Sequence, residues 1–178
     1  MSESIPKRLG RTVIYESDWV SLYVDRVQKA DGTIVEKHHN VHCPHDSVCV
    51  AVFNENGDML LIRNSRYITQ RTEWECPAGR VEDGETPEQA ARRECLEETG
   101  CTLRELRHLC TFNPNNGTCD LTVHAFAAVV ETEGGIIDTG EISAKRWFTI
   151  AGVRELLHTE MHSGVSMLTA MYALESRD

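Results

Sequence analysis

The sequence GRVEDGETPEQAARRECLEETGC, residues 79–101, carries the strongest structural signals in the chain. Thr86 precedes Pro87 and stands three positions before Gln89. This order gives an N-cap, a proline at the first helical position and the Thr-x-x-Gln form of the capping box. Gly100 stands where a glycine commonly ends a helix in the left-handed conformation. These signals predict a helix over residues 87–99.

Three glutamates of this helix, Glu94, Glu97 and Glu98, share one face because they stand at positions i, i+3 and i+4. Such a trio is most often a solvated acidic face. Here, however, a Pro77-Ala78-Gly79 turn leads toward the helix, and Mg²⁺ is bound in proteins by a few carboxylates together with substrate phosphates. A bound cation would also offset the mutual repulsion of the carboxylates. The pattern therefore indicates a divalent cation site.

The same stretch resembles the Nudix box. It follows the pattern G-x5-E-x7-R-E-x-x-E-E-x-G, with fixed residues Gly79, Glu85, Arg93, Glu94, Glu97, Glu98 and Gly100. At ordinary residue frequencies, seven such positions coincide by chance in about one window in 10⁸. Cys95 and Cys101 depart from the family pattern, which usually has aliphatic residues there. Because cysteine packs as a small hydrophobe, this departure leaves the site itself intact.

The resemblance implies Mg²⁺ as the cofactor, with Mn²⁺ as a possible substitute. The implied ligands are Glu94, Glu98 and the backbone carbonyl of Ala78, with Glu97 as a further ligand or a group that positions water. Glu85 and Arg93 are implied to form a structural ion pair that orients the preceding loop on the helix. Gly79 and Gly100 complete the structural positions of the motif.

Beyond the box, the chain resembles the branch of ADP-ribose and nucleoside-diphosphate-sugar pyrophosphatases. The features that carry this resemblance are a β-rich N-terminal segment, Ser65-Arg66-Tyr67, Glu75-Cys76-Pro77-Ala78-Gly79, and Gly140-Glu141-Ile142 ahead of Arg146-Trp147. The branch implies an assisting glutamate near the C-terminal strand, and Glu141 matches it, with Glu131 and Glu133 as competitors. Glu141 and Glu97 are both candidates for the general base.

Three residues are implied substrate contacts: Arg66, Trp19 and Glu75. The fork of the Arg66 guanidinium suits phosphate oxygens, although a surface arginine at a strand end is the alternative. Trp19 offers an aromatic face to a nucleobase, and a packing tryptophan is the alternative there. The Asn113–Gly117 loop, which is rich in turn-forming residues, is a further element that we expect near the substrate.

The reaction implied is attack of water on one phosphorus of a P–O–P linkage, which for ADP-ribose gives AMP and ribose 5-phosphate. Bound cations can acidify the water and hold the phosphate oxygens. The alternatives are a related enzyme for GDP-mannose, dinucleoside polyphosphates, oxidised nucleotides or nucleoside triphosphates, and a sensor that binds a nucleotide sugar without cleaving it. Because a degenerate sensor is expected to lose some glutamates, the intact set favours an enzyme.

The periodicity of the chain predicts an α/β fold. The expected strands are residues 11–15, 19–27, 33–41, 47–53, 59–63, 120–131 and 142–149, and the further expected helices are 151–158 and 163–175. Residues 64–84 are expected to be a loop. With the resemblance, these elements imply a Nudix-type α/β/α sandwich with a mixed sheet, preceded by an antiparallel β subdomain.

We therefore expect two domains, an N-terminal β-rich subdomain over residues 1–44 and a Nudix catalytic domain over residues 45–178. In relatives of this branch the N-terminal sheet is exchanged between subunits, and an aromatic residue there meets the base across the dimer. The resemblance thus implies a homodimer that acts on a small nucleotide sugar.

The composition limits the partners and the compartment. A net charge of −10 argues against binding to nucleic acid or to an anionic membrane, since both need a positive surface. No segment has the apolar length of a signal peptide or a spanning helix, and the seven cysteines lack the spacing of a disulfide framework. We expect reduced thiols and a cytoplasmic protein.

The segment HHNVHCPH, residues 38–45, contains residue types that bind zinc. Its spacing matches no standard zinc motif, and on a strand His38 and His39 point to opposite faces. A strand and loop that lead into the catalytic domain are therefore favoured over a metal site. An EF-hand loop is excluded for the acidic stretch because the required D-x-D-x-D-G order is absent.

Overall fold

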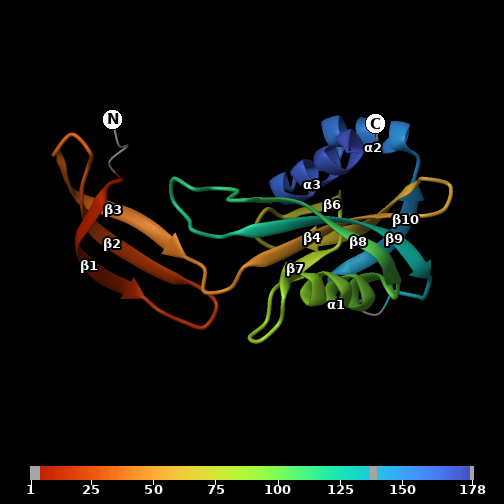
Figure 1. The fold of residues 1–178 in the computed structure, drawn as a ribbon, viewed down its shortest axis with the longest axis horizontal. Helices are drawn as coiled ribbons and strands as arrows, with labels where there is room; N and C mark the ends of the chain where they lie inside the picture. Colours follow the sequence, from red (N-terminus) through yellow and green to blue (C-terminus); the bar gives the residue numbers. More distant parts are fainter. Residues whose placement is uncertain (1–4, 137–139, 177–178) are drawn as a thin grey trace. The chain divides into compact units, whose positions relative to one another are not determined.

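The computed structural model describes residues 5–136 and 140–176, and the chain folds into two compact units (Figure 1). The first unit contains the residues up to His45 together with the segment Asn115–Leu121. The second unit contains Asp46–Pro114 and the chain from Thr122 onward. No helix of the described residues is long and apolar enough to cross a membrane.

The first unit is an antiparallel sheet of three strands in the order β1-β2-β3, which confirms the predicted N-terminal sheet. The strands are β1 (Lys7–Tyr15), β2 (Ser21–Gln28) and β3 (Ile34–His42). In the turn before β3, Gly32 has a φ of +87°, a backbone conformation that glycine adopts at low cost. The expectation that Trp19 lies on a strand is wrong, because β2 begins two residues later.

The segment Asn115–Leu121 lies between strands β8 and β9 in the chain but packs in the first unit. The Val41 amide donates to the Thr118 carbonyl at 2.8 Å, and the Asp120 amide donates to the Val41 carbonyl at 3.3 Å. These bonds form a short parallel bridge between Val41 and Cys119. The end of β3 is thereby joined to residues far along the chain.

The second unit is built on a seven-stranded mixed sheet with the main order β10-β5-β4-β9-β8. Its strands are β4 (Ser47–Phe53), β5 (Met59–Arg66), β6 (Arg71–Glu75), β7 (Ala78–Arg80), β8 (Thr102–Phe112), β9 (Val123–Thr132) and β10 (Ile142–Phe148). Among the described strands of this sheet, only β4 and β9 pair in parallel, while β6 pairs with β5 and β7 with β4. Helix α1 (Pro87–Thr99) covers one face, and α2 (Ile150–Thr159) and α3 (Gly164–Glu175) lie on the other (Figure 1). This arrangement is the predicted α/β/α sandwich.

The expected loop over residues 64–84 is wrong in part, because it contains β6 and β7. Strand β6 is rich in charged residues and β7 has only three residues, so both lack the apolar alternation by which strands are recognised. Strand β8 was not predicted either. Its pairing with β9 is interrupted by irregularities, and Glu105 has a φ of +51°. The strand predicted over residues 120–131 is β9, which starts at Val123 rather than at residue 120.

The core of the second unit lies between β4 and the helices. Six successive residues of β4 are buried, as expected for a strand covered on both faces. Helix α1 meets the sheet with three small buried residues, Ala90, Ala91 and Cys95, which pack with Val48 and Val50. Small side chains let the helix axis approach the sheet closely. The polar face of α1 consequently lies close to β7.

Both ends of α1 are capped as the sequence predicts, and the helix spans the predicted residues. The Gln89 amide donates to Thr86 Oγ1 at 3.3 Å, and the Thr86 amide donates to Gln89 Oε1 at 2.8 Å. At the other end, Gly100 has a φ of +69°, and its amide donates to the Leu96 carbonyl at 2.8 Å. A Cβ at Gly100 would lie 2.1 Å from the Gly135 carbonyl oxygen, so both the conformation and the space require glycine.

We predict that Gly100→Ala lowers the free energy of unfolding by about 2 kcal/mol or more, because a left-handed residue with a Cβ is strained and here also collides with backbone. Gly164→Ala is the matched control, since nothing lies within 4 Å of a Cβ there and its φ is not positive. The control should change stability by less than about 1 kcal/mol. Urea unfolding followed by circular dichroism measures both, and equal midpoints would contradict the prediction.

Candidate active site

Glu98 lies on the face of α1 that meets the turn at Ala78. Its Oε2 accepts a hydrogen bond of 2.9 Å from the Ala78 amide, so the carboxylate is tied to the start of β7. Burial raises the pKa of Glu98 to about 8, and the charge of Glu94 adds to this rise, whereas the bond from Ala78 opposes it. A carboxylate that is costly to ionise is therefore fixed beside the backbone.

Glu94 lies against the backbone of Gly79. A Cβ at Gly79 would come within 2.0–2.2 Å of the Glu94 carboxylate atoms. The glycine is thus the residue that makes room for this side chain. Burial raises the pKa of Glu94, while the neighbouring Arg93 lowers it. Glu94 and Glu98 are therefore two adjacent carboxylates that are partly withdrawn from water.

Arg93 connects the acidic residues to the loop before the helix. Its Nε and Nη2 donate to the two oxygens of Glu85 at 2.8 and 2.9 Å. Its Nη1 donates to Glu94 at 2.8 Å and to Glu97 at 3.1 Å, and Nη2 also reaches the Arg80 carbonyl at 2.8 Å. The bonds from Arg93, with a weaker one from the Glu82 amide, hold the pKa of Glu85 at about 2. The guanidinium thereby fixes the loop on the helix.

These groups suit a hard divalent cation, because such ions prefer carboxylate and carbonyl oxygens. In the structure, Arg93 holds Glu94 and Glu97, while Glu98 bonds to the Ala78 amide. The donor oxygens of the three glutamates do not all lie within 4.8 Å of one another, since among the described residues only another cluster meets that criterion. A cation would therefore need rotations of these side chains, and its positive charge would offset the effect of burial that raises the pKa values of Glu94 and Glu98.

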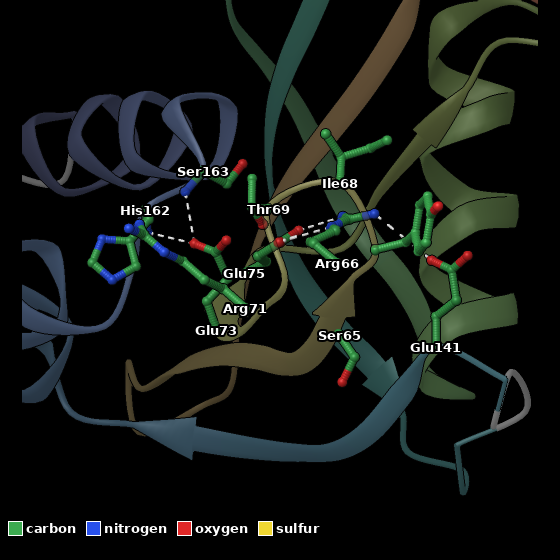
Figure 2. Close-up of a pocket in the computed structure, with 11 residues that line it drawn as sticks. Ser65, Arg66, Ile68, Thr69, Arg71, Glu73, Glu75, Glu141, His162 and Ser163 are labelled. Atoms are coloured by element: carbon green, nitrogen blue, oxygen red, sulfur yellow. Dashed lines mark hydrogen bonds and ion pairs between the residues drawn. The ribbon is translucent and has the colours of Figure 1, made fainter.

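A cavity of about 520 Å³ opens in the second unit (Figure 2). This volume lies in the range of small-molecule sites. Arg66, Glu75 and Glu141, three residues that the sequence analysis singled out, all line it. Arg66 forms a two-point ion pair with the buried Glu75, in which Nε lies 2.9 Å from Oε1, and its Nη1 lies 3.7 Å from Glu141. Figure 2 shows Arg66 between these two carboxylates.

Arg66 also links the cavity to the carboxylates of α1. Its pKa is raised first by the hydrogen bonds to Glu75, and then by the negative charges of Glu75, Glu141 and Glu98. The charge of Arg66 in turn lowers the pKa of Glu98. The charge of Arg66 in the cavity and the charge of Glu98 on the acidic face therefore influence each other.

The cavity includes residues that the sequence analysis did not single out, among them Arg71, Glu73 and His162. Glu73 is buried, and its Oε2 accepts from the His162 amide at 2.6 Å and from the Ser163 amide at 2.9 Å (Figure 2). It therefore fixes the start of α3 at the cavity wall. No sequence signal identifies this contact, because Glu73 and Ser163 are 90 residues apart.

The remaining candidates lie elsewhere. Glu133 accepts from Trp147 Nε1 at 3.1 Å, and Glu131 accepts from Thr102 Oγ1 at 3.4 Å. Neither of them lines the cavity that contains Glu141. Trp19 belongs to the first unit, where it is 73% exposed in the bend before β2.

Comparisons with known proteins identify the family of the chain. The NUDIX domain family matches residues 44–168. A CMP-5'-(N-acetyl-N-hydroxy-3-aminopropyl)phosphonate hydrolase of Streptomyces rubellomurinus is 33% identical over 151 residues, which cover 84% of this chain and 72% of that protein. An ADP-ribose pyrophosphatase of Bacillus subtilis is 28% identical over 180 residues, which cover 96% of each protein.

A solved structure has the same fold. The crystal structure of an ADP compounds hydrolase superposes with a TM-score of 0.86 at 17% identity, and the match covers 99% of this chain and 96% of that one. Because the NUDIX match spans more than half of the sequence and includes the capped helix with its glutamates, the chain belongs to the Nudix hydrolase family.

Proposed function

We propose that this Nudix hydrolase cleaves the diphosphate linkage of ADP-ribose or a related nucleoside-diphosphate sugar in a Mg²⁺-dependent reaction. The observation that carries the proposal is the pair of partly buried carboxylates, Glu94 and Glu98. The charge of Glu98 interacts with that of the cavity residue Arg66. Carboxylates bind the cation and a guanidinium binds phosphate oxygens, so the two together suit a diphosphate.

Glu94, Glu98 and the Ala78 carbonyl are the groups that we assign to the cation, with Glu97 as a further ligand or a group that positions water. When bound, the cation supplies positive charge to the phosphate oxygens and lowers the pKa of the attacking water. The bonds of Arg93 to Glu85 and to the Arg80 carbonyl keep the loop in place while the charges change. Gly79 leaves room for the Glu94 carboxylate, and Gly100 ends the helix that carries it.

We assign the proton from water to Glu141, which lines the cavity and is 65% exposed. Water attacks one phosphorus, its proton passes to the carboxylate, and the bond from that phosphorus to the bridging oxygen breaks. Glu97 is the alternative base, but it bonds to Arg93. Arg66, aligned by Glu75, binds a phosphate of the substrate through its guanidinium fork.

The relatives support a nucleotide substrate and differ in the attached group. One relative acts on ADP-ribose, and another acts on a CMP phosphonate conjugate. The second is a separate candidate for this chain, because that relative has the higher identity, 33%. In both cases we expect a nucleoside monophosphate as one product. Trp19 is our candidate for stacking on the base.

We further propose a homodimer formed through the first unit. Every residue of β1 is exposed, although the strand contains large apolar residues: Leu9 (46% exposed), Val13 (50%), Ile14 (56%) and Tyr15 (56%). Exposed apolar clusters of this kind mark interaction surfaces in soluble proteins. A second copy of the same sheet is the occupant we propose, which agrees with the strand exchange implied by the branch.

We predict that the protein releases AMP and ribose 5-phosphate from ADP-ribose with Mg²⁺ and that EDTA abolishes turnover. Glu98→Gln should lower kcat by about 100-fold or more, because a neutral amide cannot replace a ligating carboxylate. Glu88→Gln, on the exposed first turn of the same helix, is the charge-matched control. The panel should include ADP-glucose, UDP-glucose, GDP-mannose, a CMP phosphonate and nucleoside triphosphates. Full activity of Glu98→Gln, or no turnover of any compound, would refute the proposal.

We predict that metal binding releases protons. Burial raises the pKa of Glu98 to about 8, so below this pH the metal-free carboxyl is largely protonated, and a cation must displace the proton. Apparent affinity for Mn²⁺ should therefore weaken by up to about tenfold for each pH unit below 8. Titration calorimetry in two buffers of different ionisation enthalpy counts the protons. Equal proton release at about pH 6.5 and about pH 9 would contradict the assignment.

We predict that light scattering after size exclusion gives about twice the chain mass of 20.1 kDa for the native protein. Val13→Lys with Ile14→Lys should shift it to a monomer, because two charges oppose burial of the β1 surface. Met171→Lys, at an apolar position on α3 that is 53% exposed, is the control and should leave the dimer intact. A native protein that is monomeric at micromolar concentration would exclude the dimer.

A further inference from the structure

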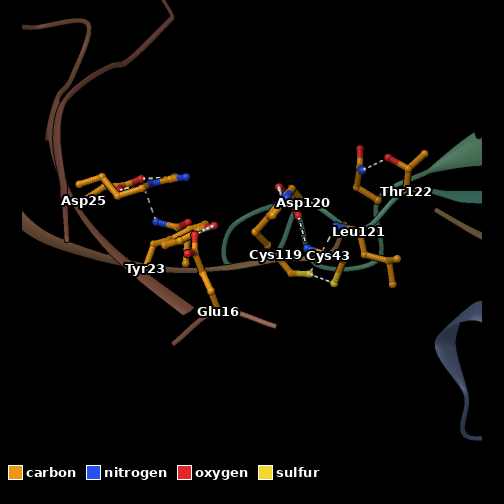
Figure 3. Close-up of polar contacts among 12 residues, drawn as sticks. Glu16, Tyr23, Asp25, Cys43, Cys119, Asp120, Leu121 and Thr122 are labelled. Carbon is orange, nitrogen blue, oxygen red and sulfur yellow. Dashed lines mark hydrogen bonds and ion pairs between the residues drawn. The ribbon is translucent and has the colours of Figure 1, made fainter. Parts of the chain in front are cut away.

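Three side chains that can bind a transition metal converge in the first unit, outside the unit that contains α1. Cys43 follows β3, whereas Cys119 and Asp120 belong to the segment Asn115–Leu121. The two Sγ atoms lie 3.5 Å apart, and the three donor atoms all lie within 4.8 Å of one another. Figure 3 shows the sulfur atoms facing each other with Asp120 beside them.

We propose that Cys43, Cys119 and Asp120 form a zinc site and that His42 positions its carboxylate. Two sulfurs bound to a tetrahedral zinc at about 2.3 Å lie about 3.8 Å apart. The observed separation of 3.5 Å therefore requires only a small movement. Three protein ligands leave the fourth tetrahedral position for water.

Backbone hydrogen bonds suit negative charge on two of the three proposed ligands, Cys119 and Asp120, whereas burial raises the pKa of the Cys43 thiol to about 11, so zinc would have to displace its proton. The Leu121 amide donates to Cys119 Sγ at 3.4 Å, which stabilises a thiolate. The Cys43 amide donates to Asp120 Oδ1 at 2.8 Å, and His42 Nδ1 lies 2.6 Å from Asp120 Oδ2. Metal-binding carboxylates commonly have such a partner, which fixes their orientation.

The orientation of His42 is fixed in turn by the sheet. Its ring stacks on Tyr23 with the centroids 6.1 Å apart. Tyr23 is buried, and its hydroxyl donates to Glu16 at 2.9 Å. The imidazole therefore has a defined position before any ion binds. We regard it as a positioning residue rather than a ligand, since its contact is with the carboxylate.

The donor set distinguishes zinc from the other possibilities. Thiolates favour zinc over magnesium, which prefers an all-oxygen site. A disulfide between the cysteines would require the sulfurs to approach from 3.5 Å to about 2.05 Å, and it would give no role to the ordered pair of Asp120 and His42. An ion here would tie the end of β3 to a segment 76 residues away.

The test uses the full chain purified without chelator. We expect about one zinc per chain by elemental analysis. With excess Mg²⁺ present to occupy the carboxylates of α1, Co²⁺ should produce a thiolate-to-cobalt charge-transfer absorption. Cys43→Ser and Cys119→Ser should each lose this absorption and at least tenfold in zinc affinity. Cys110→Ser, which alters another partly buried thiol outside the cluster, should retain both.

His42→Gln separates positioning from ligation, because it should keep the charge-transfer absorption while zinc affinity falls by about 10–100-fold. Circular dichroism checks that each variant is folded. The proposal is overturned if the native protein gives no thiolate absorption with Co²⁺, or if folded Cys43→Ser binds zinc as tightly as the native protein does. An intramolecular disulfide between Cys43 and Cys119 in the purified protein would overturn it as well.

Discussion

The close approach of α1 to strands β4 and β7 is the constraint on which the candidate site depends. Ala90, Ala91 and Cys95 let the helix lie near the sheet, and Gly79 leaves room for the Glu94 carboxylate. A larger residue at any of these positions would lift the helix or displace the carboxylate. The Ala78 amide at the start of β7 donates a hydrogen bond to Glu98 of α1, which joins the two elements directly. The positions of Glu94 and Glu98 are thus set by the packing of the helix against the sheet.

This arrangement opposes stability locally, because carboxylates that share a partly buried face repel one another and lose hydration. The rise in the pKa of Glu98 to about 8 is the direct sign of that cost. Arg93 offsets part of it by bonding to Glu85, Glu94 and Glu97 together. The remaining support comes from the capped helix ends and from the apolar contacts of α1. A cation at the carboxylates would offset this cost, so the proposed metal binding would be coupled to stability.

Sequence patterns predicted the parts of the structure that are governed by neighbouring residues. Both boundaries of α1 follow from the capping box at Thr86 and from Gly100, and β4 follows from its apolar run. Periodicity failed for β6 and β8, whose strand structure depends on pairing with β5 and β9 and not on their own alternation. It failed in the same way for Glu73, which bonds to amides 89 and 90 residues away. Contacts of this kind leave no mark in local spacing.

The same division explains why the site of this chain is easier to recognise than its substrate. The acidic face comes from one helix and one turn, so its residues have a fixed spacing in the sequence and can be recognised from that spacing. The cavity is assembled from β5, β6, the turn before β10 and the start of α3, which are far apart in the sequence. Each of these can vary without disturbing α1. Relatives in sequence are named for acting on ADP-ribose and on a CMP phosphonate. In the function proposed here, the residues around Arg66 select between such groups.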